Sequence, residues 1–156
     1  MIARQEIHQM MARLEATLDR AKPVTPIEVQ ADYAKYVCVL VSGLIEKAAY
    51  LCLLDCAQRT SSPRIQRYVE SNLSWFQNAK ASKLVELFAQ FDSLWATQLE
   101  AFLVDEKKDA VDSIVTNRHR IAHGEQVGGL SIGRMKDYYK AVKAVIEEML
   151  RICECP

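Results

Sequence analysis

The sequence predicts an all-α protein: a single helical bundle of about five to seven helices arranged around one long central helix. Apolar residues recur at three- and four-residue steps along most of the chain, which is the period of an α-helix. No alternating strand pattern, internal repeat or low-complexity segment interrupts this periodicity. With 156 residues, half of them apolar, the chain can bury a substantial core, and we expect residues 1–156 to form one domain.

Two helices are expected in the first part of the chain. Residues 2–21 place apolar side chains on one helical face, namely Ile7, Met10, Met11, Leu14 and Leu18. The segment Lys22-Pro23-Val24 ends this pattern. Thr25-Pro26-Ile27-Glu28 then has the form of a capping box with proline at the first helical position, so a long second helix should run from there to about Arg59.

The second helix is apolar on nearly all sides between Tyr36 and Ala57, which is typical of a membrane span or of a helix buried in a bundle. Glu46 and Lys47 lie in the middle of this stretch, and Asp55 lies near its end. Because charged groups are costly in lipid, we interpret the segment as the central helix of a bundle, with no membrane contact.

Polar and thiol side chains follow a regular spacing within this helix. Ser42 and Glu46, four residues apart, form a short polar stripe. Cys52 and Cys56 have the same spacing, and we interpret them as small buried side chains rather than as metal ligands.

A third helix is expected to begin at Ser62-Pro63, with Arg64 and Arg67 on its solvent side. From Asn72 to Asn78 the apolar pattern becomes irregular, which predicts a break.

Two short helices are expected next, at about residues 79–90 and 93–103, the second with Asp92 as its N-cap. Large aromatic side chains at such positions can stack on nucleic-acid bases, but they are more often buried in a core. We therefore expected burial for Trp75, Phe76, Phe91 and Trp95.

The next helix begins with the charged segment 105–109, whose acidic residues favour a helix N-terminus. Its apolar residues recur at helical spacing, namely Val111, Ile114, Val115, Ile121 and Ala122. Gly124 is a natural C′ residue, with His123 in the last turn. A glycine-rich loop at 125–133 and a final helix at about 134–152 should follow.

This helix contains the most chemically informative residues of the chain. Arg118 lies one heptad after Val111, in the middle of the apolar stripe, and a buried guanidinium needs a partner or a role. His119 and His123 lie at the edge of the same stripe. Two interpretations are open: Arg118 pairs with Glu46 inside the bundle, or Arg118 and the histidines form a site.

Composition restricts the classes of function and the cellular compartment. Twenty basic residues balance 20 acidic ones, so tight, sequence-independent adhesion to nucleic acid is not expected. Five cysteines without paired CxxC motifs indicate reduced thiols, and the N-terminus does not have the pattern of a signal peptide. We therefore expect a cytoplasmic protein. Cys153 and Cys155 can in principle bind a soft metal, but they are weak evidence for a site.

Arg118-x4-His123 resembles the RxxxxH motif of the HEPN superfamily (higher eukaryotes and prokaryotes nucleotide-binding), and most closely the bacterial RiboL-PSP-HEPN type. The resemblance spans about residues 30–152 and includes the long apolar helix, the His-Gly helix end and the final helix with its Tyr-Tyr pair. Residues 1–25 lie outside it.

The resemblance implies a helical bundle that acts as a homodimeric, metal-independent endoribonuclease, without a cofactor. Arg118 and His123 would be its catalytic residues, and His119, Glu46 and Ser42 would orient them. The implied products are a 2′,3′-cyclic phosphate and a 5′-hydroxyl, and the implied setting is a toxin–antitoxin or antiviral defence system. The partners implied are RNA and an antitoxin or an RNA-processing enzyme.

Helix geometry limits how this site can form. Arg118 and His123 are separated by about 140° and ~7.5 Å on an ideal helix. Either the helix unwinds before Gly124, or a second copy of the chain completes the site. Two alternatives to catalysis are a dimer that binds nucleotide or RNA ends for a partner enzyme, and a helical adaptor in which Arg118 is only a core ion pair.

Overall fold

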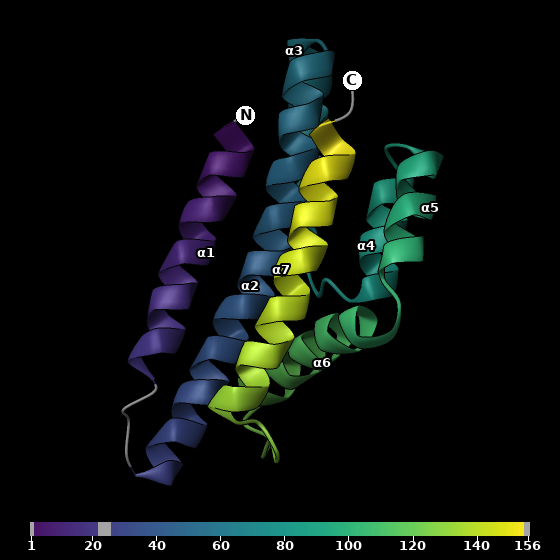
Figure 1. Ribbon diagram of the computed structural model, residues 1–156. Helices are drawn as coiled ribbons and strands as arrows, with labels where there is room; N and C mark the ends of the chain where they lie inside the picture. Colours follow the sequence, from purple (N-terminus) through teal and green to yellow (C-terminus); the bar gives the residue numbers. More distant parts are fainter. Residues whose placement is uncertain (1, 22–25, 155–156) are drawn as a thin grey trace.

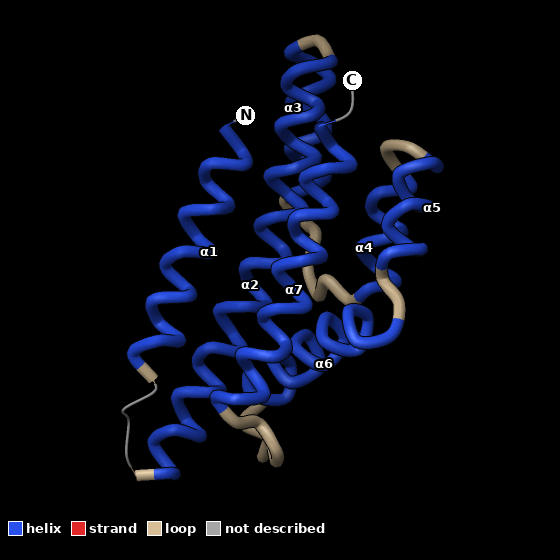
Figure 2. The backbone as a smooth tube through the Cα atoms, viewed as in Figure 1, coloured by secondary structure: helices blue, strands red, loops and turns tan. Residues whose placement is uncertain are grey.

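The computed structural model describes residues 2–21 and 26–154, and this part of the chain contains helices but no strands (Figures 1 and 2). The all-α prediction is therefore confirmed. The helices are α1 (Ile2–Arg20), α2 (Ile27–Thr60), α3 (Pro63–Leu73), α4 (Ala81–Ala89), α5 (Ser93–Phe102), α6 (Asp105–Ala122) and α7 (Ile132–Glu154).

The 34-residue helix α2 is the centre of the bundle. Helices α1 and α7 lie along α2, and α3 folds back against the C-terminal part of α2. Helix α6 crosses beneath α7 and reaches the N-terminal half of α2 (Figure 1). The pair α4 and α5 packs on the far side of α7. The predicted central helix is thus confirmed.

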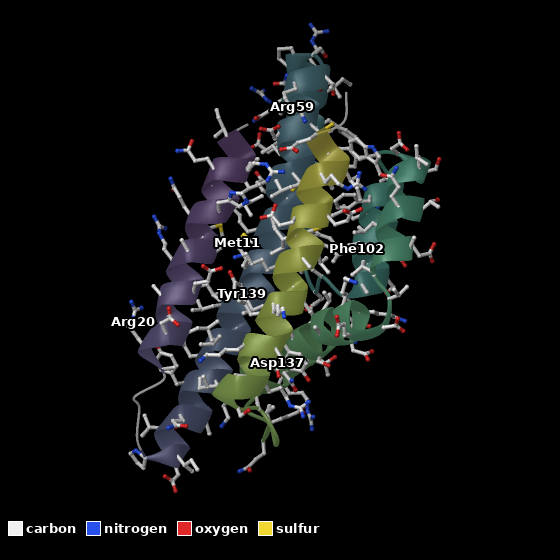
Figure 3. All side chains as sticks on the ribbon, viewed as in Figure 1. Met11, Arg20, Arg59, Phe102, Asp137 and Tyr139 are labelled. Carbon is white, nitrogen blue, oxygen red and sulfur yellow. The ribbon has the colours of Figure 1, made fainter. Side chains whose placement is uncertain are left out.

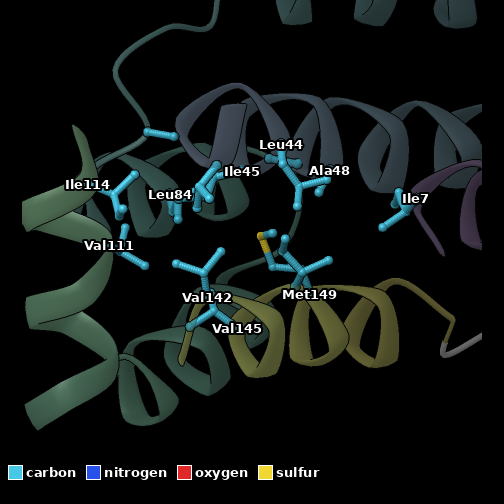
Figure 4. Close-up of a cluster of buried hydrophobic side chains, with 14 of the residues drawn as sticks. Ile7, Leu44, Ile45, Ala48, Leu84, Val111, Ile114, Val142, Val145 and Met149 are labelled. Atoms are coloured by element: carbon cyan, nitrogen blue, oxygen red, sulfur yellow. The ribbon is translucent and has the colours of Figure 1, made fainter. Parts of the chain in front are cut away.

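The core is formed where α2, α4, α6 and α7 meet (Figure 4). Ile45, Leu84, Ile114 and Val145 each have no exposed surface. Helix α2 is long and apolar enough to cross a membrane, but 67% of its most apolar window is buried inside the bundle. Burial within the bundle therefore accounts for its apolar character.

The helix boundaries follow local sequence signals closely. Pro63 occupies the first turn of α3, and Asp92 caps α5 through a 2.7 Å hydrogen bond from the backbone N–H of Leu94. The start of α2 differs from the prediction, because Pro26 is the residue before the helix and not its first residue. Thr25, the first residue of the predicted capping box, lies outside the described residues.

The burial expected for the aromatic residues is wrong for Trp75. Its side chain is 80% exposed, in the segment between α3 and α4, and no other element covers it. Phe76, Phe91 and Trp95 are half-buried against the edge of the core, so the expectation holds only in part for them.

Polar contacts fasten α1 to α7. Tyr139 donates hydrogen bonds to the carbonyl of Met11 and to Glu15 Oε1, and Lys143 Nζ lies 2.7 Å from the same carboxylate oxygen (Figure 3). Near the other end of α7, Arg4 pairs with Glu147 and Glu154. The N-terminal helix is therefore held by specific contacts as well as by apolar packing.

Candidate active site

Helix α6 places Arg118 at the edge of the core. Val111, Ile114 and Val115 are buried, and the Cys38 thiol of α2 lies 3.5 Å from the carbonyl oxygen of Ile114. Arg118 follows Ile114 by one turn on the same face and is half-buried. Arg118 therefore lies at the margin of the buried face of α6.

The end of α6 is a Schellman motif, which keeps the motif segment helical up to its last residue. His123 is the C-cap, and its N–H donates to the carbonyl of His119 at 3.1 Å. Gly124, with φ of +70°, donates to Ile121, and Glu125 donates to Arg120 at 2.9 Å. The α-helix extends to Ala122, and His123 keeps its backbone hydrogen bond to His119, so the helix is regular between Arg118 and Ala122.

The two histidines of the motif form an exposed pair. The ring centroids of His119 and His123 lie 4.4 Å apart, and the two ring planes are inclined to each other at 58°. Both side chains are exposed at the C-terminal end of α6, where the helix dipole favours a positively charged group.

Arg118 and His123 do not meet within one chain. Among the described residues, Arg118 makes no hydrogen bond or ion pair. On a regular helix, the side chains of Arg118 and His123 leave the helix axis in directions about 140° apart. One chain thus presents a half-buried, unpaired guanidinium and, on an adjoining face, an exposed imidazole pair.

The direct ion pair expected between Glu46 and Arg118 is wrong. Glu46 Oε1 instead accepts a 2.9 Å hydrogen bond from the backbone N–H of Asn78, in the segment between α3 and α4. Asn78 has a φ of 56°, in the left-handed region that asparagine tolerates better than most residues. The carboxylate therefore anchors this segment to α2.

Ser42 lies deep in the bundle, one turn after Cys38. It is 1% exposed, and its hydroxyl has no hydrogen-bond partner among the described residues. Neither Ser42 nor Glu46 touches Arg118 or His123 in this part of the chain, so their expected orienting roles stay predictions.

A contact that the sequence did not reveal joins α4 to α6. Asp112 Oδ1 accepts a 2.8 Å hydrogen bond from the backbone N–H of Ala81, and thereby caps α4 from another helix. No local pattern signals it, because 31 residues separate the partners.

A polar cleft of about 820 Å³ runs between α6 and α7. Arg134 and Tyr138 lie on its α7 side, where the guanidinium is 5.9 Å from the tyrosine ring centroid. The hydrogen bond from Arg134 to the Tyr138 hydroxyl raises the pKa of the guanidinium. The cleft also contains Glu106 and Asp109, so its charge is mixed and favours no single class of ligand.

The described residues contain no cluster of three or more side chains suited to a metal ion. Burial raises the pKa of the Cys38 thiol to about 11. A hydrogen bond with Cys52, together with burial, raises the pKa of Cys153. Cys155 lies outside the described residues.

An all-α bundle with Arg-x4-His at the end of a late helix has the pattern of a HEPN-type protein. The chain matches the RiboL-PSP-HEPN family over residues 6–154, and it belongs to that family. The match includes most of α1, which the motif-based resemblance did not cover. No curated protein and no solved structure matches the chain significantly.

Proposed function

We propose that the protein is a metal-independent endoribonuclease that acts as a homodimer, with Arg118 and His123 as its catalytic residues. The observation that supports this best is the state of Arg118. A half-buried guanidinium on the apolar face of α6 has no ion-pair partner among the described residues. A purely structural arginine at such a position normally has a partner, because an unpaired charge next to a core is costly.

A second copy of the chain would place a histidine opposite the arginine, which one chain alone does not. Arg118 and His123 point about 140° apart on one regular helix, so a phosphodiester cannot contact both from one side. In a two-fold dimer with the α6 ends near the axis, the arginine of one copy and the histidine of the other face a common cleft. RNA bound there would lie across both chains.

The proposed reaction is an internal transesterification of RNA. The 2′-oxygen attacks the adjacent phosphorus, the bond from phosphorus to the 5′-oxygen breaks, and a 2′,3′-cyclic phosphate remains. His123 accepts the 2′-hydroxyl proton or donates a proton to the departing 5′-oxygen. Arg118 offers paired N–H donors to the phosphoryl oxygens as negative charge develops on them.

His119 is proposed as a positioning residue. Its ring lies 4.4 Å from that of His123, centroid to centroid, and this contact would limit the directions that the catalytic imidazole can adopt. We place the protein in a bacterial defence or toxin–antitoxin system in the cytoplasm, with an antitoxin or an RNA-processing enzyme as partner. Family membership is the support for this setting.

A second candidate function is binding without cleavage, in which the dimer holds a nucleotide or an RNA end for a partner enzyme. The separation of Arg118 from His123 in one chain favours it, because an arginine alone can bind phosphate. An adaptor with Arg118 as a core ion pair is not favoured, because Glu46 bonds to Asn78 instead.

Cleavage of RNA by the purified protein in EDTA tests the proposal. We expect Arg118→Ala to lower the cleavage rate about 10²–10³-fold, the range for a lost transition-state donor. Arg120→Ala is the matched control: it removes an exposed arginine of the same helix, whose partner is Glu125. Binding of RNA by the wild-type protein without any turnover would favour the second candidate.

A further inference from the structure

We propose that Cys52 of α2 and Cys153 of α7 are an oxidisable thiol pair, which a hydroperoxide converts into a disulfide that ties the last turn of α7 to the central helix. Cys153 lies in that last turn, whereas the Arg118 motif lies at the end of α6, at the opposite end of the bundle (Figure 1). The inference does not depend on the proposed cleavage of RNA.

Three of the five cysteines gather where the C-terminal end of α7 packs on α2. Cys52 and Cys56 lie one turn apart on α2, and the thiol of Cys52 forms a hydrogen bond with that of Cys153. Cys52 and Cys153 have no exposed surface, and Cys56 is half-buried beside them. All three thiols are free. Two sulfur atoms from different helices are thus in contact within a buried cluster.

Arg59 holds the backbone of α7 against α2 at this level. It lies three residues after Cys56, and its Nη2 donates a 2.7 Å hydrogen bond to the carbonyl oxygen of Cys153 (Figure 3). Its Nε lies 2.7 Å from Asp55 Oδ2 on the preceding turn. Because the two helices are fixed here, sulfur atoms in hydrogen-bond contact need only side-chain rotation and a small approach to reach the ~2.05 Å of a disulfide bond.

Two other interpretations of the thiol cluster are less favoured. Within residues 2–21 and 26–154, no group of three or more side chains is suited to a metal ion. Packing of small apolar groups accounts for burial of each cysteine, but it does not require sulfur atoms of two helices to be neighbours. In a reducing compartment a disulfide between such neighbours is transient, which is the behaviour of a redox-sensing pair.

The oxidation takes two balanced steps. A hydroperoxide, ROOH, oxidises one thiol of the pair to a sulfenic acid and leaves as the alcohol ROH. The sulfur of the other thiol then attacks the sulfenic sulfur, the S–O bond breaks, and water leaves with the proton of the attacking thiol. The two sulfur atoms lose two electrons, which the O–O bond of ROOH accepts. The contact with Cys52, followed by burial, raises the pKa of Cys153, which lowers the fraction of reactive thiolate, so we expect oxidation over minutes to hours.

Peptide mapping of the peroxide-treated protein tests the pair directly. Cys155 is replaced in every sample by Cys155→Ser, so that Cys153 is the one cysteine of the tryptic peptide 152–156. After hydrogen peroxide and alkylation of the remaining thiols, we expect peptide 48–59, which contains Cys52 and Cys56, to be joined to peptide 152–156. The joined species is two hydrogen atoms lighter than the sum of the reduced peptides, and fragmentation should place the bond on Cys52.

Serine variants supply the matched comparison. Cys52→Ser should lower the yield of joined peptide at least about tenfold, because it removes the sulfur in contact with Cys153. Cys38→Ser, which replaces another buried thiol of the same helix, and Cys56→Ser should both leave that yield within about twofold of the parent. The melting temperature of each reduced variant shows that it folds.

Thermal unfolding provides a second readout. The disulfide closes a loop of about 100 residues in the unfolded chain, so peroxide should raise the Tm by about 10 °C, and dithiothreitol should reverse the rise. Arg118→Ala should form the disulfide as the parent does, whatever its effect on RNA. If peroxide produces no joined peptide, if the bond lies on Cys56, if Cys52→Ser keeps the full yield, or if the Tm does not rise, the proposed thiol pair is wrong.

Discussion

The rings of His119 and His123 lie against each other at the end of α6, with centroids 4.4 Å apart and planes inclined at 58°. The helix presents this pair because His123 is its C-cap and still bonds through its backbone to the carbonyl of His119. The regular helix keeps the pair on a different face from Arg118. The catalytic proposal therefore depends on a second chain.

His119 should act by positioning His123 rather than by moving protons. We expect His119→Phe, which keeps an aromatic ring beside His123, to retain more activity than His119→Ala. Both variants should lose less than His123→Ala, for which about 10²–10⁴-fold is typical of a lost acid–base group. Single-turnover cleavage rates measure this order. If His119→Phe and His123→Ala lose activity equally, His119 has a direct chemical role.

Glu46 should contribute to stability through the 74–80 segment. Glu46→Ala removes the acceptor for the Asn78 N–H, and hydrogen bonds to charged groups contribute about 1.5–3 kcal/mol. Because the contact is partly exposed, we expect about 1.5 kcal/mol, measured by urea unfolding. Glu46→Gln keeps an acceptor and should cost less. An unchanged unfolding free energy in Glu46→Ala would show that the anchor does not matter.

Acid should weaken the attachment of α1 to α7. The hydrogen bond from Lys143, followed by that from Tyr139, lowers the pKa of Glu15 below its ordinary value of 4.5. Since the folded state prefers the ionised carboxylate, the stability that it contributes is complete above about pH 4.5 and is lost as pH falls through the folded-state pKa.

We therefore expect the unfolding free energy of wild type to exceed that of Glu15→Gln at neutral pH, and this difference to shrink below pH 4.5. Urea unfolding across the acid range measures it. Glu100→Gln, at an exposed position on α5, is the control for removing a carboxylate charge. If the difference in unfolding free energy between wild type and Glu15→Gln does not change with pH, the lowered pKa of Glu15 is contradicted.

The dimer should include the exposed surface of α2 around Tyr36 and Val39 as well as the α6 ends. Tyr36 and Val39 are exposed on this helix, and Val39 lies on the same face as Glu46, seven residues further on. In light scattering at micromolar concentration, we expect a mass twice the 17.7 kDa of one chain. Val39→Glu should give the monomer mass, whereas Ile2→Glu, on the exposed side of α1, should not. A monomeric wild type would contradict the proposed site.

Features set by neighbouring residues could be predicted from the sequence. The Asp92 cap of α5 and the Gly124 end of α6 depend on hydrogen bonds within a few residues, and the sequence pattern identified both. The half-buried position of Arg118 likewise followed from its place in the apolar stripe of α6.

Features set by contacts between distant segments could not be predicted in the same way. Glu46 was free by sequence to pair with Arg118, and only the path of the 74–80 segment brings Asn78 to it. The exposure of Trp75 depends on whether another element covers it, and residue type indicates only the average preference. The cap that Asp112 of α6 supplies to α4 likewise depends on the packing of two segments distant in the sequence.

Analysis of the RNA ends is the most direct test of the proposed chemistry. Purified protein should cleave RNA in EDTA to give a 2′,3′-cyclic phosphate on the 5′ fragment and a 5′-hydroxyl on the 3′ fragment. A single 2′-deoxy substitution at the cleaved position should block that bond alone, and His123→Ala should abolish both products. A 5′-phosphate on the 3′ fragment, or loss of activity in EDTA, would contradict transesterification by Arg118 and His123.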